Sequence, residues 1–364
     1  MEKQKMEFIH GGDVYTEGIL KGKELIDFSS NINPLGVPGS FKDNINEALA
    51  NVTRYPDVRY RELIGYLVQY VNGENNFDIS HDSFLLGNGA AEVIDLAISS
   101  FKNLLLVVPS FAEYEEDALK WEANIVYSYL NKNMEYDYED IYSKLQEVDA
   151  LVIANPNNPS GNIIDKESFK KILEFCEENN KTIIIDEAFV EFTGSKEQSF
   201  VREVNSYKCL FIIRALTKFF ALPGIRFGFG ISKNIELINK LKKRQNPWNI
   251  NCFAETAAKY VLKDKEYIKS SLKWIEEEKR FFPERLKDVS FIERVYNTNS
   301  NYVLCKLKGI MGEELYKLCM EQGILIRRAR NFKGLDDTFV RFAIKDRELN
   351  TKFLEVLNTI EKLK

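Results

Sequence analysis

The chain has 364 residues and a formal net charge of −5, with basic and acidic residues interleaved along its length. This length exceeds the usual size of one domain, and the charge balance argues against nucleic acid or an anionic membrane as the main partner. The five cysteines are scattered without a Cys-x-x-Cys pair and there are two histidines, which argues against a disulfide framework or a metal site.

The first six residues are charged rather than apolar, so the sequence shows no signal peptide. No apolar run approaches the ~18 residues that are needed to span a bilayer. Hydrophobic residues make up 45% of the chain and charged residues 29%, which is typical of a folded protein. We therefore expect a cytoplasmic α/β protein.

The chain is expected to begin with a turn-rich segment, residues 1–38, that packs on the smaller of two domains. From residue 82 to about residue 232, short apolar runs alternate with periodic helical segments such as 91–101 and 166–179. The runs are rich in Leu, Ile and Val, as is typical of strands that are buried on both faces. The seven expected strands are 84–86, 104–108, 124–128, 151–154, 182–185, 210–213 and 226–231. The alternation predicts a large domain, residues 39–255, with a mainly parallel seven-stranded sheet between helices.

After residue 248 the pattern changes to that of a smaller α+β domain, residues 256–364. Segments 254–262 and 266–286 have the periodicity of long helices, and we expect the second of them to bridge the two domains. The remaining expected elements are strands at 302–306, 324–327 and 339–344 and helices at 312–321 and 350–363.

A segment of small residues follows the first expected strand and opens a helix. Gly89, Ala90 and Ala91 would let the backbone approach a ligand closely, and the free N–H groups of a helix N-terminus suit a phosphate. A plain strand-to-helix turn has the same composition, so this segment alone does not decide between the two interpretations.

Two polar side chains follow later strands. Segment 155–161 carries two prolines, which fix the backbone and present Asn158 on a rigid turn, although an ordinary loop has a similar composition. Asp186 closes an apolar strand, where a carboxylate is costly to bury unless a cation or a donor meets it. A protonated pyridine nitrogen is such a cation, and a helix cap or a surface ion pair is the alternative.

Lys218 lies among apolar residues, with Arg214 and Arg226 near it in the sequence. Desolvation and neighbouring positive charge both lower the pKa of a lysine, which makes the free amine available as a nucleophile. A single lysine is more often a surface residue with its ammonium group in water, but the apolar sequence around Lys218 argues against that fate.

In this order, the four segments resemble the fold-type I enzymes that depend on pyridoxal 5′-phosphate, specifically the class II aminotransferase branch that contains histidinol-phosphate aminotransferase. The resemblance covers essentially the whole chain. It implies that Lys218 holds the cofactor as an imine and shuttles protons, and that Asp186 pairs with the pyridinium nitrogen. The further cofactor-binding residues that it implies are Gly89, Ala90, Ala91, Tyr114, Asn158, Thr217, Arg226 and Tyr55.

The same resemblance implies particular roles for some of these residues. Asn158 would bond the ring oxygen and Tyr114 would stack on the ring face, whereas the amides of Ala90 and Ala91, with Thr217 and Arg226, would hold the cofactor phosphate. Tyr55 would reach the cofactor phosphate of the second subunit, which implies a homodimer with shared active sites. Arg341 would clamp the substrate α-carboxylate in a bidentate pair.

Other segments resemble the threonine-phosphate decarboxylases of cobalamin biosynthesis. These are the N-terminal motif 10–13 and the segments 27–36, 111–114, 245–248 and 324–327. By this resemblance, His10 and Arg327 would bind the substrate phosphate, and Asn33 would line the substrate pocket. His10 could instead be an N-terminal turn residue and Arg327 a surface charge.

Two positions bear on this second resemblance. Asp13 stands where the decarboxylases usually have asparagine. Phe189 stands where the common aminotransferase pattern has tyrosine, so no phenol is available there to bond the ring oxygen.

Three functions remain open from the sequence. The first is decarboxylation of O-phospho-L-threonine to (R)-1-amino-2-propanol phosphate, and the second is transamination of histidinol phosphate with 2-oxoglutarate. They differ in which α-carbon bond breaks, which depends on a substrate orientation that the sequence does not show. The third is a regulator that has kept the cofactor-binding domain, but no basic DNA-binding extension precedes the domain here. We favour the first.

Overall fold

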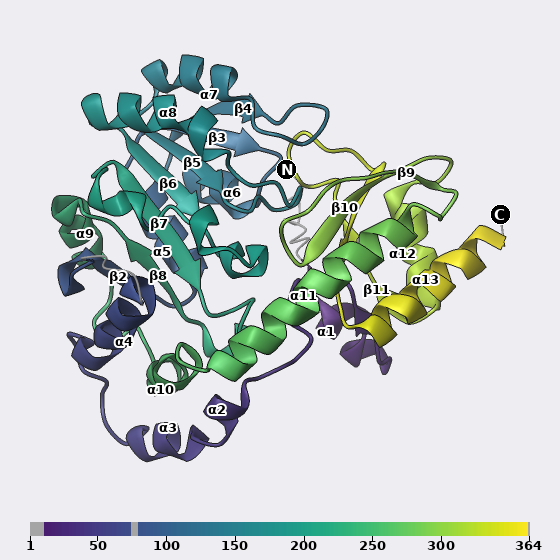
Figure 1. Cartoon of the computed structure of the whole chain (residues 1–364), viewed down its shortest axis with the longest axis horizontal. Coiled ribbons are helices and arrows are strands. Elements are labelled where there is room, and N and C mark those ends of the chain that lie inside the picture. Colours follow the sequence, from purple (N-terminus) through teal and green to yellow (C-terminus); the bar gives the residue numbers. More distant parts are fainter. Residues whose placement is uncertain (1–10, 74–78, 363–364) are drawn as a thin grey trace, which may run out of the picture.

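The computed structural model describes residues 11–73 and 79–362, which form two main sheets with helices around them (Figure 1). The larger sheet has seven strands in the order β2-β8-β7-β6-β5-β3-β4. All neighbours pair in parallel except β8, which is antiparallel to both β2 and β7. The strands are β2 (Phe84–Gly87), β3 (Asn103–Val108), β4 (Asn124–Tyr129), β5 (Ala150–Ala154), β6 (Thr182–Asp186), β7 (Leu210–Ala215) and β8 (Gly228–Ile231).

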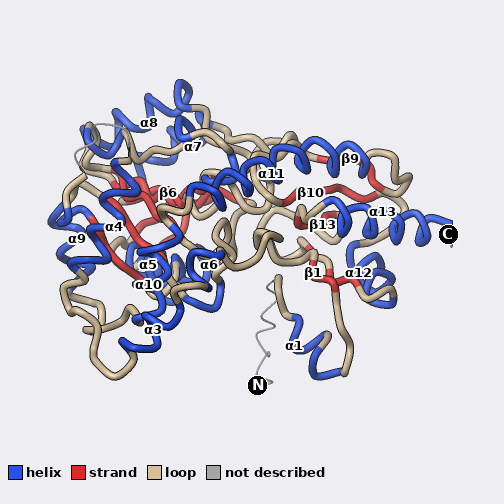
Figure 2. Tube along the Cα trace, turned by 60° about the horizontal axis from the view of Figure 1, so that its bottom comes forward, coloured by secondary structure: helices blue, strands red, loops and turns tan. Residues whose placement is uncertain are grey.

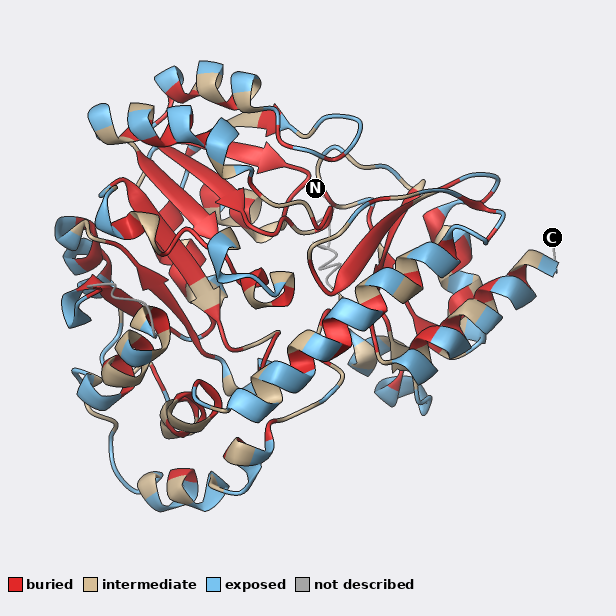
Figure 3. Ribbon diagram, viewed as in Figure 1, coloured by how far each residue is buried: buried red, intermediate tan, exposed pale blue. Residues whose placement is uncertain are grey.

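Alternation along the central strands explains why their sequences are apolar throughout. Successive side chains of a strand point to opposite faces of the sheet. In β6, Ile183 and Ile185 therefore belong to one hydrophobic cluster and Ile184 to another. Both clusters are covered by helices, so the strands are buried on both faces (Figure 3).

Different helices supply the two clusters. The first face is covered by α4 (Arg61–Asn72), α7 (Tyr138–Lys144) and α8 (Lys166–Glu178). The second face is covered by α5 (Ala90–Ile98), α6 (Glu113–Lys120) and α9 (Ile235–Lys242). Short helices α2 (Gly39–Lys42) and α3 (Ile45–Asn51) contact α10 (Cys252–Val261).

The smaller sheet is antiparallel, in the order β12-β13-β10-β9. Its strands are β9 (Ile292–Val295), β10 (Tyr302–Leu307), β12 (Arg327–Arg328) and β13 (Phe339–Ala343). The helices beside it are α11 (Lys265–Leu286), α12 (Gly312–Glu321) and α13 (Arg347–Lys362). Helix α11 runs from the large sheet to the small one, as the sequence predicted (Figure 1).

The N-terminal segment lies with the C-terminal part of the chain. Its strand β1 (Ile26–Asp27) pairs in parallel with β11 (Ile324–Leu325), and the ring of Phe28 contacts those of Phe282 and Phe353. Figure 2 shows β1 and α1 (Val14–Glu17) on the side of α12, away from the large sheet.

The structure confirms the predicted α/β class and all seven strands of the mainly parallel sheet. Two details of the small sheet differ. Strand β9 was not predicted, because it is a half-exposed edge strand of four residues. The single strand expected at 324–327 is two strands, since β11 pairs with β1 and β12 pairs with β13. None of the helices within the described residues has the length and apolar character that crossing a bilayer requires.

Candidate active site

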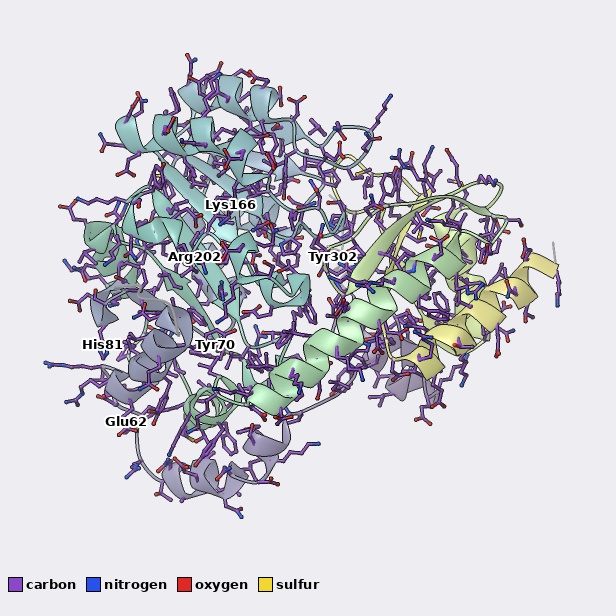
Figure 4. The ribbon with its side chains drawn as sticks, viewed as in Figure 1. Glu62, Tyr70, His81, Lys166, Arg202 and Tyr302 are labelled. Carbon is purple, nitrogen blue, oxygen red and sulfur yellow. The ribbon has the colours of Figure 1, made fainter. Side chains whose placement is uncertain are left out.

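A cavity of about 280 Å³ lies where β5, β6 and β7 end, between the large sheet and the small one. Ligands of open α/β sheets gather at this carboxyl edge of the strands. Four cationic side chains line the cavity, namely Lys218, Arg226, Arg327 and Arg341, against the two carboxylates of Asp186 and Glu113. The excess of positive charge suits an anionic ligand. The labelled Tyr302 marks the border of the two sheets in Figure 4, and its hydroxyl donates to the Asn157 carbonyl across that border over 2.8 Å.

Lys218 lies in the loop after β7, and the buried rings of Phe219 and Phe220 follow it. Burial, together with the nearby Arg341 and Arg226, lowers the pKa of Lys218 to about 8. A neutral amine is therefore accessible near neutral pH, as expected for a nucleophile.

Arg214 does not take part in lowering this pKa, contrary to the sequence expectation. Its guanidinium lies on the other side of the sheet end, in ion pairs with Glu187 and Glu191. Successive residues of β7 point to opposite faces, which proximity in sequence does not reveal.

Asp186 is the last residue of β6 and is buried. Its Oδ2 accepts a hydrogen bond of 2.6 Å from the Tyr114 hydroxyl, and its Oδ1 accepts one of 2.9 Å from the Ala188 amide. Burial raises the pKa of Asp186, and these two donors oppose the rise. Burial also raises the pKa of Tyr114 well above its ordinary value, so its hydroxyl remains a donor. The Asp186 side chain also lines the cavity, so a cationic group of a ligand could pair with its carboxylate there.

The N-terminus of α5 forms the phosphate-sized end of the cavity. Gly89 precedes the helix with φ +87°, a conformation that favours glycine, and a Cβ there would overlap the Arg226 guanidinium. Arg226 donates over 3.4 Å to the Asn88 carbonyl, so its charge lies beside the first free amides of the helix, at Ala90 and Ala91. A guanidinium and free amides of a helix N-terminus bind phosphate well. Thr217 also lines this cavity.

Arg341 lies on β13 and its guanidinium is buried at the opposite end of the cavity. One Nη donates to the Asn158 side chain and the other donates over 2.8 Å to the Ser29 carbonyl. Its Nε is buried and has no hydrogen-bond partner among the described residues. A buried donor without a partner costs free energy, which an oxygen of a ligand would relieve.

Arg327 is the register partner of Arg341 on the adjacent strand β12. Its guanidinium donates to the Arg328 carbonyl over 2.9 Å and to the Asn331 side chain over 2.8 Å, and it lies over the ring of Phe332. Burial and the nearby Arg341 lower the pKa of Arg327 to about 9. Two buried cations side by side indicate a binding site for an anion with more than one charged group.

A turn within segment 27–36 supports these cations, a role that the sequence did not predict. Asp27 accepts hydrogen bonds from the backbone and hydroxyl groups of Ser29 and Ser30. The carbonyls of the two serines then accept from Arg341 and from the Lys345 ammonium group, at 2.8 and 3.2 Å. An Asp-x-Ser-Ser turn is a local sequence signal, but the partners of its carbonyls lie more than three hundred residues away.

The structure contradicts the expected position of Asn33. Its Nδ2 donates to the Phe219 carbonyl and to the Ser271 hydroxyl, both over 2.8 Å, and its amide donates to the Lys218 carbonyl over 3.1 Å. Asn33 therefore anchors the loop of the reactive lysine and does not line the cavity. Asn31 lines the cavity instead, and its Oδ1 is buried without a partner among the described residues.

Phe189 lines the cavity between Lys218 and Tyr302. Its ring meets that of Tyr302 edge to face at 5.1 Å, and the Lys218 Nζ lies 5.9 Å from its centre. No hydroxyl is present at this position, as the sequence implied.

The roles of two further expected site residues remain predictions. His10 lies outside the described residues, although the neighbouring Gly11 lines the cavity. Tyr55 is 79% exposed and its ring contacts that of Trp248. Its expected contact with the cofactor of a second subunit stays a prediction.

The comparisons with known proteins identify the family of this chain. The family model described as aminotransferase class I and II matches residues 23–357. The chain belongs to this family. Aminotransferases of class I and II use pyridoxal phosphate, and the residues described above fit that cofactor: a helix N-terminus with Arg226 for the phosphate, Asp186 for a ring cation and the low-pKa amine of Lys218.

Individual relatives within the aminotransferase family carry two different names. A protein from Caldanaerobacter subterraneus subsp. tengcongensis, provisionally named threonine-phosphate decarboxylase, is 37% identical over 98% of this chain and 95% of its own. Threonine-phosphate decarboxylase from Salmonella typhimurium is 29% identical over 96% of both chains. A crystal structure described as the histidinol-phosphate aminotransferase from Clostridium acetobutylicum is 54% identical, with a TM-score of 0.90 over 93% of this chain and 100% of its own. The family and the fold are thus clear, and the names divide over the reaction.

Proposed function

We propose that this enzyme decarboxylates O-phospho-L-threonine to (R)-1-amino-2-propanol phosphate and carbon dioxide. The observation that carries the proposal is the position of Gly11. It lines the cavity, and a Cβ on it would overlap the Ser29 carbonyl and come within 3.5 Å of the Arg327 Cδ. Gly11, which belongs to the N-terminal motif that resembles the decarboxylases, therefore packs closely beside Ser29 and Arg327, and only glycine allows this approach.

The arrangement of cations supports a compact substrate with two anionic ends. We assign Arg341 to the α-carboxylate, because its Nε lacks a partner and its guanidinium is aligned by Asn158 and Ser29. We assign Arg327, with His10, to the substrate phosphate. The two arginines are direct neighbours across β12 and β13, and a carboxylate and a phosphate on adjacent carbons of one amino acid fit that spacing.

The remaining chemistry belongs to the cofactor and to two catalytic residues, Lys218 and Asp186. Pyridoxal phosphate, when bound, supplies an electron sink for the α-carbon. Asp186 would pair with a positive charge on the ring nitrogen, and the hydrogen bond from Tyr114 opposes the rise that burial causes in the pKa of this carboxylate. Lys218 can hold or release a proton near neutral pH because its pKa is about 8, so it can deliver the proton that replaces carbon dioxide.

The second candidate is transamination of histidinol phosphate with 2-oxoglutarate. It is favoured by the 54% identity to the structure described as a histidinol-phosphate aminotransferase. The two buried arginines also suit it, because both of its substrates are anionic.

One assay separates the two reactions. The purified enzyme with pyridoxal phosphate is incubated with O-phospho-L-threonine in the absence of any keto acid, and carbon dioxide is measured. We expect sustained release that is stoichiometric with the aminopropanol phosphate formed. In parallel, glutamate is measured with histidinol phosphate and 2-oxoglutarate. Glutamate formation without carbon dioxide release from phosphothreonine would establish the aminotransferase and refute the decarboxylase.

We further propose that the enzyme is a homodimer in which Tyr55 contacts the cofactor phosphate of the opposite subunit. The support is a group of exposed apolar side chains around Tyr55 in segments that are adjacent in sequence or in space. They are Leu49, Val52, Tyr55, Val58 and Trp248. Apolar side chains that cluster on a surface are typical of an interface between subunits.

A further inference from the structure

A second and larger cavity, of about 800 Å³, lies behind the active site. It is bounded by α4, α10, the first turns of α11 and the 3-10 segments that follow β6. Its wall includes Phe219, the neighbour of Lys218, and Glu191, which lies five residues beyond Asp186 in the chain. Figure 4 labels Tyr70 and Arg202, two of the residues that line this cavity.

The inner end of this cavity is a network of buried charges. Arg214 forms ion pairs with Glu187 at 3.0 Å and with Glu191 at 3.4 Å, and the Tyr70 hydroxyl donates to Glu191 over 3.2 Å. These contacts use one oxygen of the Glu191 carboxylate. The other, Oε2, is buried and has no hydrogen-bond partner among the described residues, and the side chain is 10% exposed. A buried acceptor in this state is stabilised by a donor on a ligand.

The middle and the rim of the cavity have a different character. The middle is apolar, with the buried side chains of Val201, Phe219 and Leu262 among its walls. The rim carries ammonium groups from two segments, those of Lys196 after β6 and of Lys263 and Lys265 around the start of α11, all of which are exposed. From rim to interior, the cavity thus presents cations, then an apolar section, then a hydrogen-bond acceptor.

We propose that this cavity binds an organic anion with an apolar, ring-sized body and one hydrogen-bond donor. The acidic group of the ligand lies at the lysine rim, its apolar body contacts the walls, and its donor meets Glu191. Volumes of several hundred Å³ and mainly apolar walls with a few polar groups are typical of small-molecule sites. The active site contains none of these groups, so the site stands whichever reaction the active site performs.

The dye 1-anilinonaphthalene-8-sulfonate has these three features and becomes fluorescent when it leaves water, so it serves as the probe. The enzyme loaded with pyridoxal phosphate is titrated with the dye, and we expect saturation at one dye per chain. Ile268→Trp, which fills the cavity from α11, should abolish this binding. The double variant Lys196→Glu/Lys265→Glu should weaken it about tenfold, because two attractive charges become repulsive.

The control is Lys273→Glu, which changes the same charge on the same helix outside the cavity, at a side chain that is 77% exposed. It should bind the dye like the unaltered enzyme. Cofactor absorbance and turnover should remain unchanged in all of these variants, which shows that they fold. Absence of saturable binding, or equal binding in Ile268→Trp, would mean adventitious contact with apolar surface and would overturn the proposal.

Discussion

The pKa of Lys218 is lowered by three features, of which Arg226 is near it in sequence and Arg341 is distant. Burial contributes most, and the guanidinium groups of Arg341 and Arg226 add to it. An amine in this environment is neutral above about pH 8 and protonated below it, whereas an exposed lysine is protonated up to about pH 10. Because only the neutral amine condenses with an aldehyde, the capture of the cofactor depends on this pKa.

We therefore expect the rate at which the cofactor-free enzyme takes up pyridoxal phosphate to rise with pH and to level off above about pH 8. The measurement is stopped-flow absorbance of the cofactor between pH 6 and pH 10. This range extends roughly two pH units to either side of the expected midpoint. Arg341→Gln removes one repelling charge and should move the midpoint upward. A midpoint near that of a free lysine in the unaltered enzyme would contradict the buried position of the amine.

Tyr114 donates to a carboxylate that is otherwise weakly supported. Tyr114→Phe removes the 2.6 Å bond to Asp186, so the pKa of this buried carboxylate should rise further and its neutral form should gain population. We expect the cofactor to bind about tenfold more weakly, since a hydrogen bond to a buried charge is worth about 1.5–3 kcal/mol. Equilibrium dialysis measures the affinity.

The matched control is Tyr127→Phe. The Tyr127 hydroxyl donates to Glu115 outside the cavity, so the cofactor affinity should remain unchanged. Equal losses in both variants would indicate a general effect of removing a tyrosine hydroxyl.

At the scale of single residues, the sequence does not reveal in which direction a side chain points. Lys218, Asp186 and Asn158 were identifiable because each combines an unusual residue type with an apolar strand or a rigid turn. Asn31 and Asn33 are separated by one residue in a loop, and the sequence does not reveal which of them faces the cavity. The choice between them depends on Ser271, on a helix 238 residues away.

At the scale of elements, the junction of β2 and α5 is the most constrained. Gly89→Ala puts a side chain where φ is +87° and displaces Arg226. We expect cofactor affinity to fall about tenfold, because both the backbone strain and the shifted guanidinium act against phosphate binding. Gly39→Ala in α2 is the control, since a Cβ there would meet nothing within 4 Å. If both glycine variants bind the cofactor normally, the phosphate lies elsewhere.

The pair of strands β12 and β13 carries the two arginines that we assign to the substrate. Arg327→Ala should raise the KM for the phosphorylated substrate by about tenfold or more, because a charged hydrogen bond to phosphate is lost. Arg328→Ala changes the adjacent residue, whose guanidinium pairs with Glu313 away from the cavity, and should leave the KM nearly unchanged. Steady-state kinetics with O-phospho-L-threonine compare the two variants. A larger effect in Arg328→Ala would refute the assignment of Arg327.

Elements were predicted best where the signal is local. The apolar strands and the periodic helices of the large sheet meet this condition, and so does α11. Strand β9 and the break between β11 and β12 depend on which neighbour each strand finds, and β1 lies nearly three hundred residues from the strand it pairs with. Such pairing is decided by the tertiary fold.

At the scale of the whole molecule, the proposed sharing of active sites between two subunits makes a quantitative prediction. Tyr55→Ala and Lys218→Ala should each be nearly inactive as homodimers, because each lacks one residue at both sites. When the two are unfolded together and refolded, about half of the dimers are mixed, and one of the two sites in each is intact. Activity should return to about one quarter of the unaltered enzyme. Absence of recovery, with mixed dimers shown by native mass spectrometry, would place Tyr55 outside the opposite site.

Asn33 links the N-terminal segment to the loop of Lys218 and to α11 through three hydrogen bonds. The loop of the reactive amine is thus held by a part of the chain that supplies none of the cofactor-binding residues named above. A chimaera that exchanged only the first forty or so residues with those of a distant relative would retain every cofactor contact and still misplace its nucleophile. A chimaera of this fold should therefore retain activity only when the N-terminal segment and the loop of Lys218 come from the same protein.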